Sequence, residues 1–331
     1  MFSKKSILLI IAIFMLFSCL ILSVQAAETQ ITMRIAHAMP VAHGYNVWAE
    51  KFKEELYARV GDKIEVQIFP NAQLGTETEY LEQMKIGAIE GTILGRHAQI
   101  DKRLEVVNLP FILQDDAHED LVLRSGNEIE QKLNNIFLEH GYVCLGWGVL
   151  GFRHITTKDR EVRRASDLKG LSIRIPNNPL WIPAFQAWGA SPTPLDFSEL
   201  YSALQQGVID AQENPPEIIY NSRFYEVQKY LNLTSHANIP SQFLVSTNFW
   251  NKLSEDIKKS IEEAAIVARD YHVKLTREAN INLIAELEKL GMIVIRDVDR
   301  ESFYEGGQKA YEAYISQCGD ELLNDIQKLA K

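Results

Sequence analysis

Apolar and polar positions follow each other along this chain in two rhythms. Residues 64–68 switch between apolar and polar side chains at every step, which predicts a half-buried strand. Residues 45–56 instead place large apolar side chains three or four positions apart, which predicts a helix with one buried face. The exchange of the two patterns continues from Thr32 to about Phe249. Such alternation favours an α/β fold in which helices cover both faces of the sheets.

Short apolar runs indicate the strands and the places where the chain changes sheets. Strands are expected at residues 32–36, 64–68, 89–94, 106–109, 142–150, 171–175 and 208–211. We expect the chain to cross to a second domain at residues 149–152 and to return near residues 237–241. The two expected domains are residues 27–151 with 240–279, and residues 152–239 with 280–331.

Residues 255–290 form the longest helical pattern, since they contain neither proline nor glycine. Ser254 is a suitable cap at the start, and Gly291 suits the end. One helix of about 36 residues would be roughly 54 Å long, which exceeds a small domain. We therefore expect it to run across both domains. The alternative is two shorter helices with a break near residues 270–272.

The N-terminus has the pattern of an export signal. Two lysines precede an apolar run that extends to Leu22, and residues 24–26 resemble a small-residue cleavage site. We expect residues 1–26 to be a signal peptide that directs the chain to the periplasm. A retained membrane anchor and lipid attachment at Cys19 are the alternatives.

Charge limits the partners. The chain has a net charge of -10, and loss of the two lysines of residues 1–26 would bring it to about -12. An acidic protein repels polyphosphates, so nucleic acid is not an expected partner. Any anion site must be built from a few local cations. Cys144 and Cys318 remain after cleavage, and we favour two separate thiols over a disulfide because Cys144 lies in an apolar run.

Several catalytic and cofactor motifs fail. Residues 146–151 match a dinucleotide-binding glycine pattern, but strand-like residues follow where a helix would have to begin. His37 and His43 lack helical spacing and a wider Cys/His cluster, so no metal is expected. They lie between a first strand and a first helix, where ligands of α/β sheets often bind. No nucleophile–base pair is evident, so we expect neither an enzyme nor a cofactor.

Two polar residues stand at strand ends. Arg174 lies among apolar neighbours just before Pro176 and must meet an anion. That anion is either an internal carboxylate or a ligand carboxylate held by parallel hydrogen bonds, and the residues alone leave both open. Asn214 and Pro215 are interpreted as the N-cap and first residue of a helix that follows a short strand.

Residues 169–176 and 204–215 together resemble the solute-binding proteins of TRAP transporters, in the dicarboxylate-binding DctP-type family. The similarity extends to residues 71–75 and 109–111 and covers nearly the whole mature chain. It implies a two-domain α/β periplasmic-binding architecture with crossing strands and a long helix. It also implies that the domains close on a small organic acid.

The resemblance assigns ligand contacts. In the second domain it implies a carboxylate clamp and a wall formed by Arg174, Asn214, Arg153 and Phe197. The expected contributors of the first domain are His37, Glu90 and Arg96. Glu90 departs from the Asp that many relatives carry, and Arg96 lies where members vary with their substrate.

The expected partners are the organic acid and the membrane permease of a TRAP transporter, with the chain as a monomer. One alternative is a periplasmic binding protein that serves a sensor. Another is a periplasmic enzyme acting on an organic acid, with Glu90, Glu213 or a histidine as general acid or base. The sequence leaves the identity of the acid open.

Overall fold

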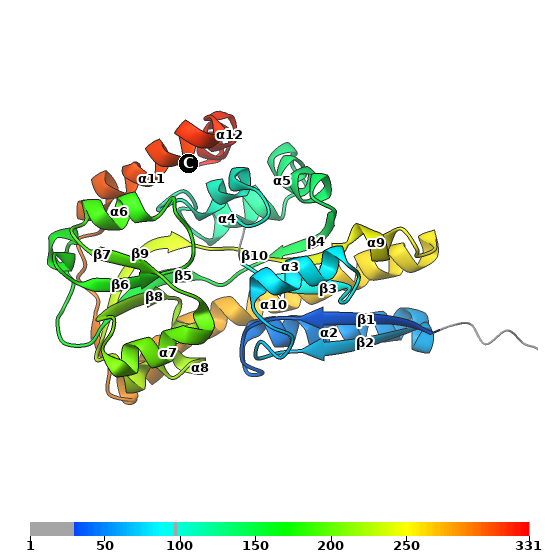
Figure 1. Cartoon of the computed structure of the whole chain (residues 1–331), viewed down its shortest axis with the longest axis horizontal. Coiled ribbons are helices and arrows are strands. Elements are labelled where there is room, and N and C mark those ends of the chain that lie inside the picture. Colours follow the sequence, from blue (N-terminus) through cyan, green and yellow to red (C-terminus); the bar gives the residue numbers. More distant parts are fainter. Residues whose placement is uncertain (1–29, 96–97, 331) are drawn as a thin grey trace, which may run out of the picture.

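The computed structural model describes residues 30–95 and 98–330, which form two α/β units joined side by side (Figure 1). The expected signal peptide lies outside these residues. Each unit is built on its own sheet, with strand orders β2-β1-β3-β10-β4 and β11-β9-β5-β8-β6-β7 in the described chain. The predicted two-domain α/β architecture is confirmed.

The first sheet is mixed. Its strand β1 (Ile31–Ala36) is parallel to β2 (Ile64–Phe69) and to β3 (Gly91–Leu94). Strand β10 (Ser241–Ser246) runs antiparallel to β3 and to β4 (Tyr142–Gly148). The helices that follow or precede these strands are α2 (Gly44–Val60), α3 (Glu77–Lys85), α4 (Asp116–Leu123), α5 (Glu128–Glu139) and α9 (Thr247–Trp250).

The second sheet is also mixed, because β5 is antiparallel to both of its neighbours while β6 is parallel to β7 and β8. Its strands are β5 (Phe152–Thr157), β6 (Ser172–Ile175), β7 (Ser191–Pro194), β8 (Ala211–Asn214), β9 (Tyr230–Asn238) and β11 (Ile293–Ile295). The helices of this half and the C-terminal end are α6 (Ile182–Ala187), α7 (Phe197–Gln206), α8 (Pro216–Asn221), α11 (Tyr304–Cys318) and α12 (Glu321–Leu329). Short 3-10 helices connect the elements: η1 (Gly61–Lys63), η2 (Lys102–Asn108), η3 (Ala165–Leu168), η4 (Phe224–Glu226) and η5 (Arg300–Phe303).

The chain crosses between the sheets at both expected places. It leaves the first sheet after β4, enters the second at β5, and returns between β9 and β10. Gly151 lies on the first crossing with a φ of 103°, and a Cβ there would stand 2.4 Å from the side-chain nitrogen of Asn280. Only glycine fits this crossing without displacing its neighbours.

Helix α10 (Glu255–Lys289) is one continuous helix of 35 residues that packs against α2 in the first unit and α8 in the second. Ser254 caps it by accepting a hydrogen bond from the backbone N–H of Ile257. Figure 1 shows it running behind the strands from the first half into the second. The prediction of a domain-spanning helix is confirmed, and the two-helix alternative is wrong.

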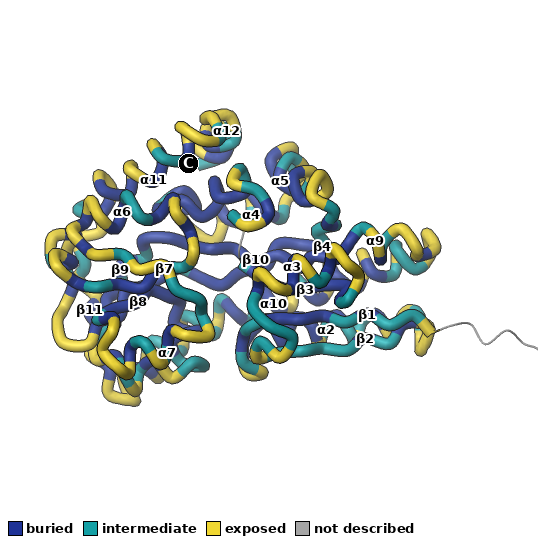
Figure 2. The backbone as a smooth tube through the Cα atoms, viewed as in Figure 1, coloured by how far each residue is buried: buried dark blue, intermediate teal, exposed yellow. Residues whose placement is uncertain are grey.

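The buried residues are concentrated in the strands and on the inner faces of the helices, whereas exposed positions follow the outer helices (Figure 2). In the first unit Trp48 and Phe52 pack edge-on against Phe243 of β10. Cys144 and Cys318 carry free thiols. Among the described helices, none is both long and apolar enough to cross a membrane.

Three local predictions are wrong. The strand expected at residues 208–211 instead begins at the last of these residues, since β8 is Ala211–Asn214. Residues 106–109 lie mainly in η2 rather than in a strand, since a short apolar run does not distinguish the two. Asn214 is the last residue of β8, and Pro215 is the N-cap of α8. The side chain of Asn214 is engaged in the sheet instead, with Gln212 and Arg153.

Candidate functional site

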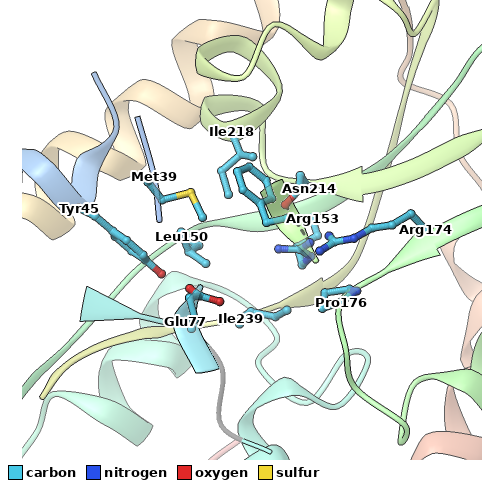
Figure 3. Close-up of a pocket in the computed structure, with 12 residues that line it drawn as sticks. Met39, Tyr45, Glu77, Leu150, Arg153, Arg174, Pro176, Asn214, Ile218 and Ile239 are labelled. Atoms are coloured by element: carbon cyan, nitrogen blue, oxygen red, sulfur yellow. Dashed lines mark hydrogen bonds between the residues drawn. The ribbon is translucent and has the colours of Figure 1, made fainter. Parts of the chain in front are cut away.

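A pocket with about 440 Å³ of space free of protein atoms lies between the two units (Figure 3). The first unit contributes Met39, Tyr45, Glu77 and Gly95. The second unit contributes Arg153, Arg174, Pro176, Phe197, Asn214 and Ile218. Leu150 and Ile239 come from the two crossings, so the segments that join the units also line the pocket.

Arg153 is held firmly in place within the second sheet. Only 2% of the residue is exposed, and its Nε forms a short hydrogen bond to the Glu213 carboxylate. Its Nη2 donates to the Glu213 carbonyl oxygen at 2.6 Å, to Glu213 Oε1 at 2.8 Å and to Asn214 Oδ1 at 2.9 Å. The guanidinium also lies 5.9 Å from the Trp181 ring centroid. The internal carboxylate thus balances the charge of this arginine and fixes its orientation.

Glu213 keeps its charge despite complete burial. Burial alone would raise the pKa of Glu213, but the charge and hydrogen bonds of Arg153 outweigh it and hold the pKa below its ordinary value. His236 Nε2 lies 3.4 Å from the same carboxylate, although burial lowers the pKa of His236. The Arg153–Glu213 pair is therefore ionised at neutral pH.

Arg174 occupies β6, and 2% of it is exposed. Its Nε donates a hydrogen bond to the carbonyl oxygen of Leu195 at 2.9 Å, which anchors the base of the guanidinium. Figure 3 shows the guanidinium groups of Arg174 and Arg153 directed to the same end of the pocket, beside Asn214. Two planar cations at one end of a pocket form a site for an anion, and a carboxylate matches their fork geometry.

A chain of buried hydrogen bonds fixes the Asn214 amide. Its Nδ2 donates to Gln212 Oε1 at 2.5 Å, and Gln212 Nε2 donates to Thr156 Oγ1 at 2.8 Å. Thr156 in turn donates to Gln228 at 3.0 Å. Because every member has a partner inside the protein, the polar groups of this wall are arranged before a ligand arrives.

The opposite wall offers a phenol and a carboxylate. Tyr45 lies on α2 and is 1% exposed; burial, aided by the negative charge of Glu77, raises its pKa well above the ordinary value. Its hydroxyl is therefore protonated. Glu77 is the first residue of α3 and is 8% exposed. A helix N-terminus stabilises a negative charge at this place.

The pocket brings together four of the seven predicted ligand residues: Arg153, Arg174, Phe197 and Asn214. Phe197 begins α7 and packs edge-on against Phe224, with ring centroids 6.0 Å apart. It forms part of the wall beside the arginines.

Two of the other predicted residues, His37 and Glu90, do not line this pocket. His37 is fully buried, and its Nε2 lies 3.3 Å from Asn46 Oδ1. Glu90 accepts hydrogen bonds from Arg34, whose Nη2 lies 2.6 Å from Glu90 Oε1. Arg96 lies outside the described residues. His43, named beside His37, instead caps α2 by accepting from the backbone N–H of Tyr45.

Tyr45 and Glu77 were not predicted from the sequence. Thr76 and Glu79 form a capping box, which marks the start of α3 but not a ligand contact. The residue between strand and helix in such a fold commonly faces a ligand, which was the available signal. No cluster of three or more His, Cys, Asp or Glu suited to a metal ion occurs in residues 30–95 and 98–330.

Comparisons with known proteins agree with this architecture. Residues 35–317 match the DctP family, described as bacterial extracellular solute-binding protein, family 7. A solute-binding protein of Verminephrobacter eiseniae is 33% identical over 303 residues, which cover 91% of this chain and 90% of that protein.

Two solved structures are similar throughout. A TRAP periplasmic solute-binding protein from Polaromonas sp. JS666, bound to D-erythronate, has a TM-score of 0.86 and 33% identity, covering 91% of this chain and 99% of the other. One from Bordetella bronchispeptica, with density assigned to pantoate, has a TM-score of 0.86 and 34% identity over 91% and 100% of the two chains. The chain thus belongs to the DctP family of bacterial extracellular solute-binding proteins, those of TRAP transporters.

Proposed function

We propose that this protein captures a small organic acid between its two domains and delivers it to the membrane permease of a TRAP transporter. The observation that carries the proposal is the pair of buried arginines beside Asn214, at one end of a pocket that both domains line. The similar proteins from Polaromonas and Bordetella hold erythronate and a molecule assigned as pantoate, both of which are carboxylates.

Arg174 is the main attraction for the ligand carboxylate. The charge of Arg153 is already balanced by Glu213, so Arg153 serves chiefly to donate hydrogen bonds and to orient Asn214. Arg174 is anchored through Nε to a backbone carbonyl, and its guanidinium is directed into the pocket. The Asn214 amide lies beside both groups.

Capture proceeds by domain closure. A ligand that touches both walls favours the closed arrangement because only that arrangement makes both sets of contacts. Closure also removes water and strengthens the pairing between arginine and carboxylate. The proposed rigid bodies are residues 27–151 with 240–279 and residues 152–239 with 280–331.

We infer binding without catalysis, because the carboxylates that could act as general acid or base in an enzyme are already paired. Glu213 is paired with Arg153, and Glu90 is held by Arg34, so each is already engaged.

Residues 1–26 are proposed to export the chain to the periplasm, where the family acts, and to be removed there.

Isothermal titration of the mature protein, stripped of carried-over ligand, against a panel of small acids and neutral sugars tests the proposal. We expect an acid to bind, and Arg174→Ala to weaken that binding by at least about tenfold. Arg164→Ala, which removes an exposed arginine of the same domain, is the matched control and should bind normally. Equal affinity of wild type and Arg174→Ala for the true ligand would refute the assignment of Arg174. Binding of neutral sugars alone would refute the acid.

A further inference from the structure

Helix α2 begins at the boundary between the two units, and its first turn is capped from both of them. His43, the N-cap, accepts a hydrogen bond from the backbone N–H of Tyr45 through Nδ1. The N–H of Gly44 donates instead to Glu217 Oε1 at 2.8 Å, on α8 of the second unit. The first N–H groups of a helix have no partner within the helix and attract oxygen acceptors. Glu217 therefore completes a cap that the first unit leaves open.

The contact is shielded from water. Glu217 is 5% exposed and His43 is 1% exposed, and Gly44 is also buried. Within residues 30–95 and 98–330, the second oxygen of Glu217, Oε2, is buried without a hydrogen-bond partner. The Gly44 N–H is thus the donor that holds this carboxyl group. Since buried donors and acceptors are costly to leave unpaired, the two surfaces fit together only when this hydrogen bond is made.

The backbone at Glu217 is fixed against the segments that join the units. Its N–H donates to Asn280 Oδ1 at 3.0 Å, and Asn280 Nδ2 donates to the carbonyl oxygen of Leu150 at 2.9 Å. Asn280 lies on α10, and Leu150 lies on the first crossing. A Cβ on Gly44 would stand 2.5 Å from Thr276 Oγ1, so the absence of a side chain lets α2 approach α10 closely. The Glu217 side chain reaches across from this fixed base.

The two partners are each one residue away from the pocket. Tyr45 follows Gly44 and Ile218 follows Glu217, and both of these side chains border the pocket (Figure 3). Glu217 itself does not line the pocket. The hydrogen bond between the neighbours therefore sets how closely a first-unit wall residue approaches a second-unit wall residue.

Given the proposed capture by domain closure, on which this inference rests, we propose that Glu217 is a positioning residue that caps α2 across the boundary and holds the two units closed on a bound acid. It acts through the walls of the pocket and does not touch the ligand. Because the contact joins the units once they have closed, it slows the escape of the acid and leaves its entry unchanged.

Three variants of the mature protein test this, with D-erythronate and pantoate as the first probes and the other acids of the panel after them. Isothermal titration gives the affinity, and stopped-flow tryptophan fluorescence gives the two rates. Glu217→Leu removes the acceptor, so the dissociation rate should rise about tenfold. Association should change by less than about twofold. Glu217→Gln keeps an oxygen acceptor at the same place and should stay within about threefold of wild type. Glu199→Leu, at an exposed place on α7, is the matched control and should behave as wild type.

A further variant and a stability measurement separate positioning from folding. Glu217→Asp keeps the carboxyl group but is one methylene shorter, so it should also release the acid several-fold faster; it replaces Glu217→Leu if that variant does not fold. Denaturant titration of each variant gives its free energy of unfolding. Dissociation as slow as in wild type, whether or not stability falls, would overturn the inference. A loss of affinity in Glu217→Gln as large as in Glu217→Leu would do the same.

This inference and the proposed function fail in different ways. If an acid binds to wild type and Arg174→Ala weakens it, while the Glu217 variants release it at the wild-type rate, the capture of an acid stands and the role of Glu217 is wrong. If no acid in the panel binds to wild type, the capture function is wrong and the role of Glu217 falls with it.

Discussion

Glu213 and Glu217 stand four positions apart on either side of the turn from β8 to α8, and both are buried, at 0% and 5% exposure. Glu213 faces Arg153, and its pKa is held below the ordinary value. Glu217 Oε1 accepts one hydrogen bond from the Gly44 N–H at 2.8 Å, across the boundary between the units. Burial raises the pKa of Glu217 to about 7, and Gly44 opposes this only in part.

The contrast teaches that burial does not by itself decide the charge of a carboxyl group. The same desolvation acts on both residues, and only a guanidinium in direct contact reverses it. Glu105 in η2 behaves like Glu217. Burial raises the pKa of Glu105 to about 7, although Asn108, the Ala98 backbone and Asn178 donate hydrogen bonds to it. Neutral donors are weaker than a cation in this role.

The largest expected effect comes from removing the charge of Glu213. Glu213→Gln leaves Arg153 buried with an uncompensated charge, and we expect the free energy of unfolding to fall by about 3–5 kcal/mol. Denaturant titration followed by circular dichroism measures this. Glu199→Gln, at an exposed place on α7, should change stability little. If Glu213→Gln loses no more unfolding free energy than this control, the charge of Glu213 does not stabilise buried Arg153, and Glu213 no longer differs from Glu217 in this respect.

The pH dependence of the free energy of unfolding should report on Glu105 and Glu217, whose described hydrogen-bond donors are neutral groups. Folding raises the pKa of Glu105 and of Glu217 from 4.5 to about 7, so each stabilises the fold when protonated. This contribution is complete below pH 4.5 and is lost as pH rises through about 7. Each group should cost roughly 3 kcal/mol of unfolding free energy between pH 4.5 and 8.

Denaturation at a series of pH values, with Glu217→Gln and Glu105→Gln beside wild type, measures these contributions. Each amide should remove its own share of the pH dependence, because it keeps the hydrogen-bond acceptor but carries no ionisable group. Buried histidines with lowered pKa values, such as His154 and His272, add an opposite slope below about pH 6.5 to wild type and variants alike, so the comparison is made between the slopes. Amides that leave the slope of the wild-type profile unchanged would contradict the assigned pKa directions.

The smallest effect concerns the neutral donor to Glu217. A Cβ on Gly44 would lie 2.5 Å from Thr276 Oγ1, so Gly44→Ala must displace the start of α2 and stretch the hydrogen bond to Glu217. We expect a loss of about 1–3 kcal/mol in unfolding free energy. Adding Thr276→Ala removes the closest of these contacts and should restore part of the loss, since the His272 ring still lies 3.0 Å from the added Cβ. If the double variant regains none of the lost unfolding free energy, the contact between the added Cβ and Thr276 is not the cause of the loss.

Patterns within single segments predicted much of the fold. The long helix, both crossings and the alternation of strands and helices follow from runs of side chains that are local in sequence. The second-domain residues of the pocket were predicted from the family resemblance, because the residues alone left the anion partner of Arg174 open. The role of Glu213 as the partner of Arg153 was not predicted, since the two residues lie 60 positions apart in the sequence.

The first-domain wall shows where such reasoning fails. Glu90 was named there, but Arg34 on the adjacent strand binds it within the first sheet. Glu77 and Tyr45 reach the pocket only because α2 and α3 are placed by the packing of the whole unit. No local spacing encodes which of several helix starts will face the second domain.

The two crossings also form part of the wall against which the solute lies, through Leu150 and Ile239. In the proposed capture by domain closure, a bound solute would therefore contact the segments about which the units move. A solute of suitable length would let Leu150 and Ile239 pack against it as the units approach, whereas one that is too long would press on the crossings and oppose closure. The crossings would then select solutes by size during closure itself.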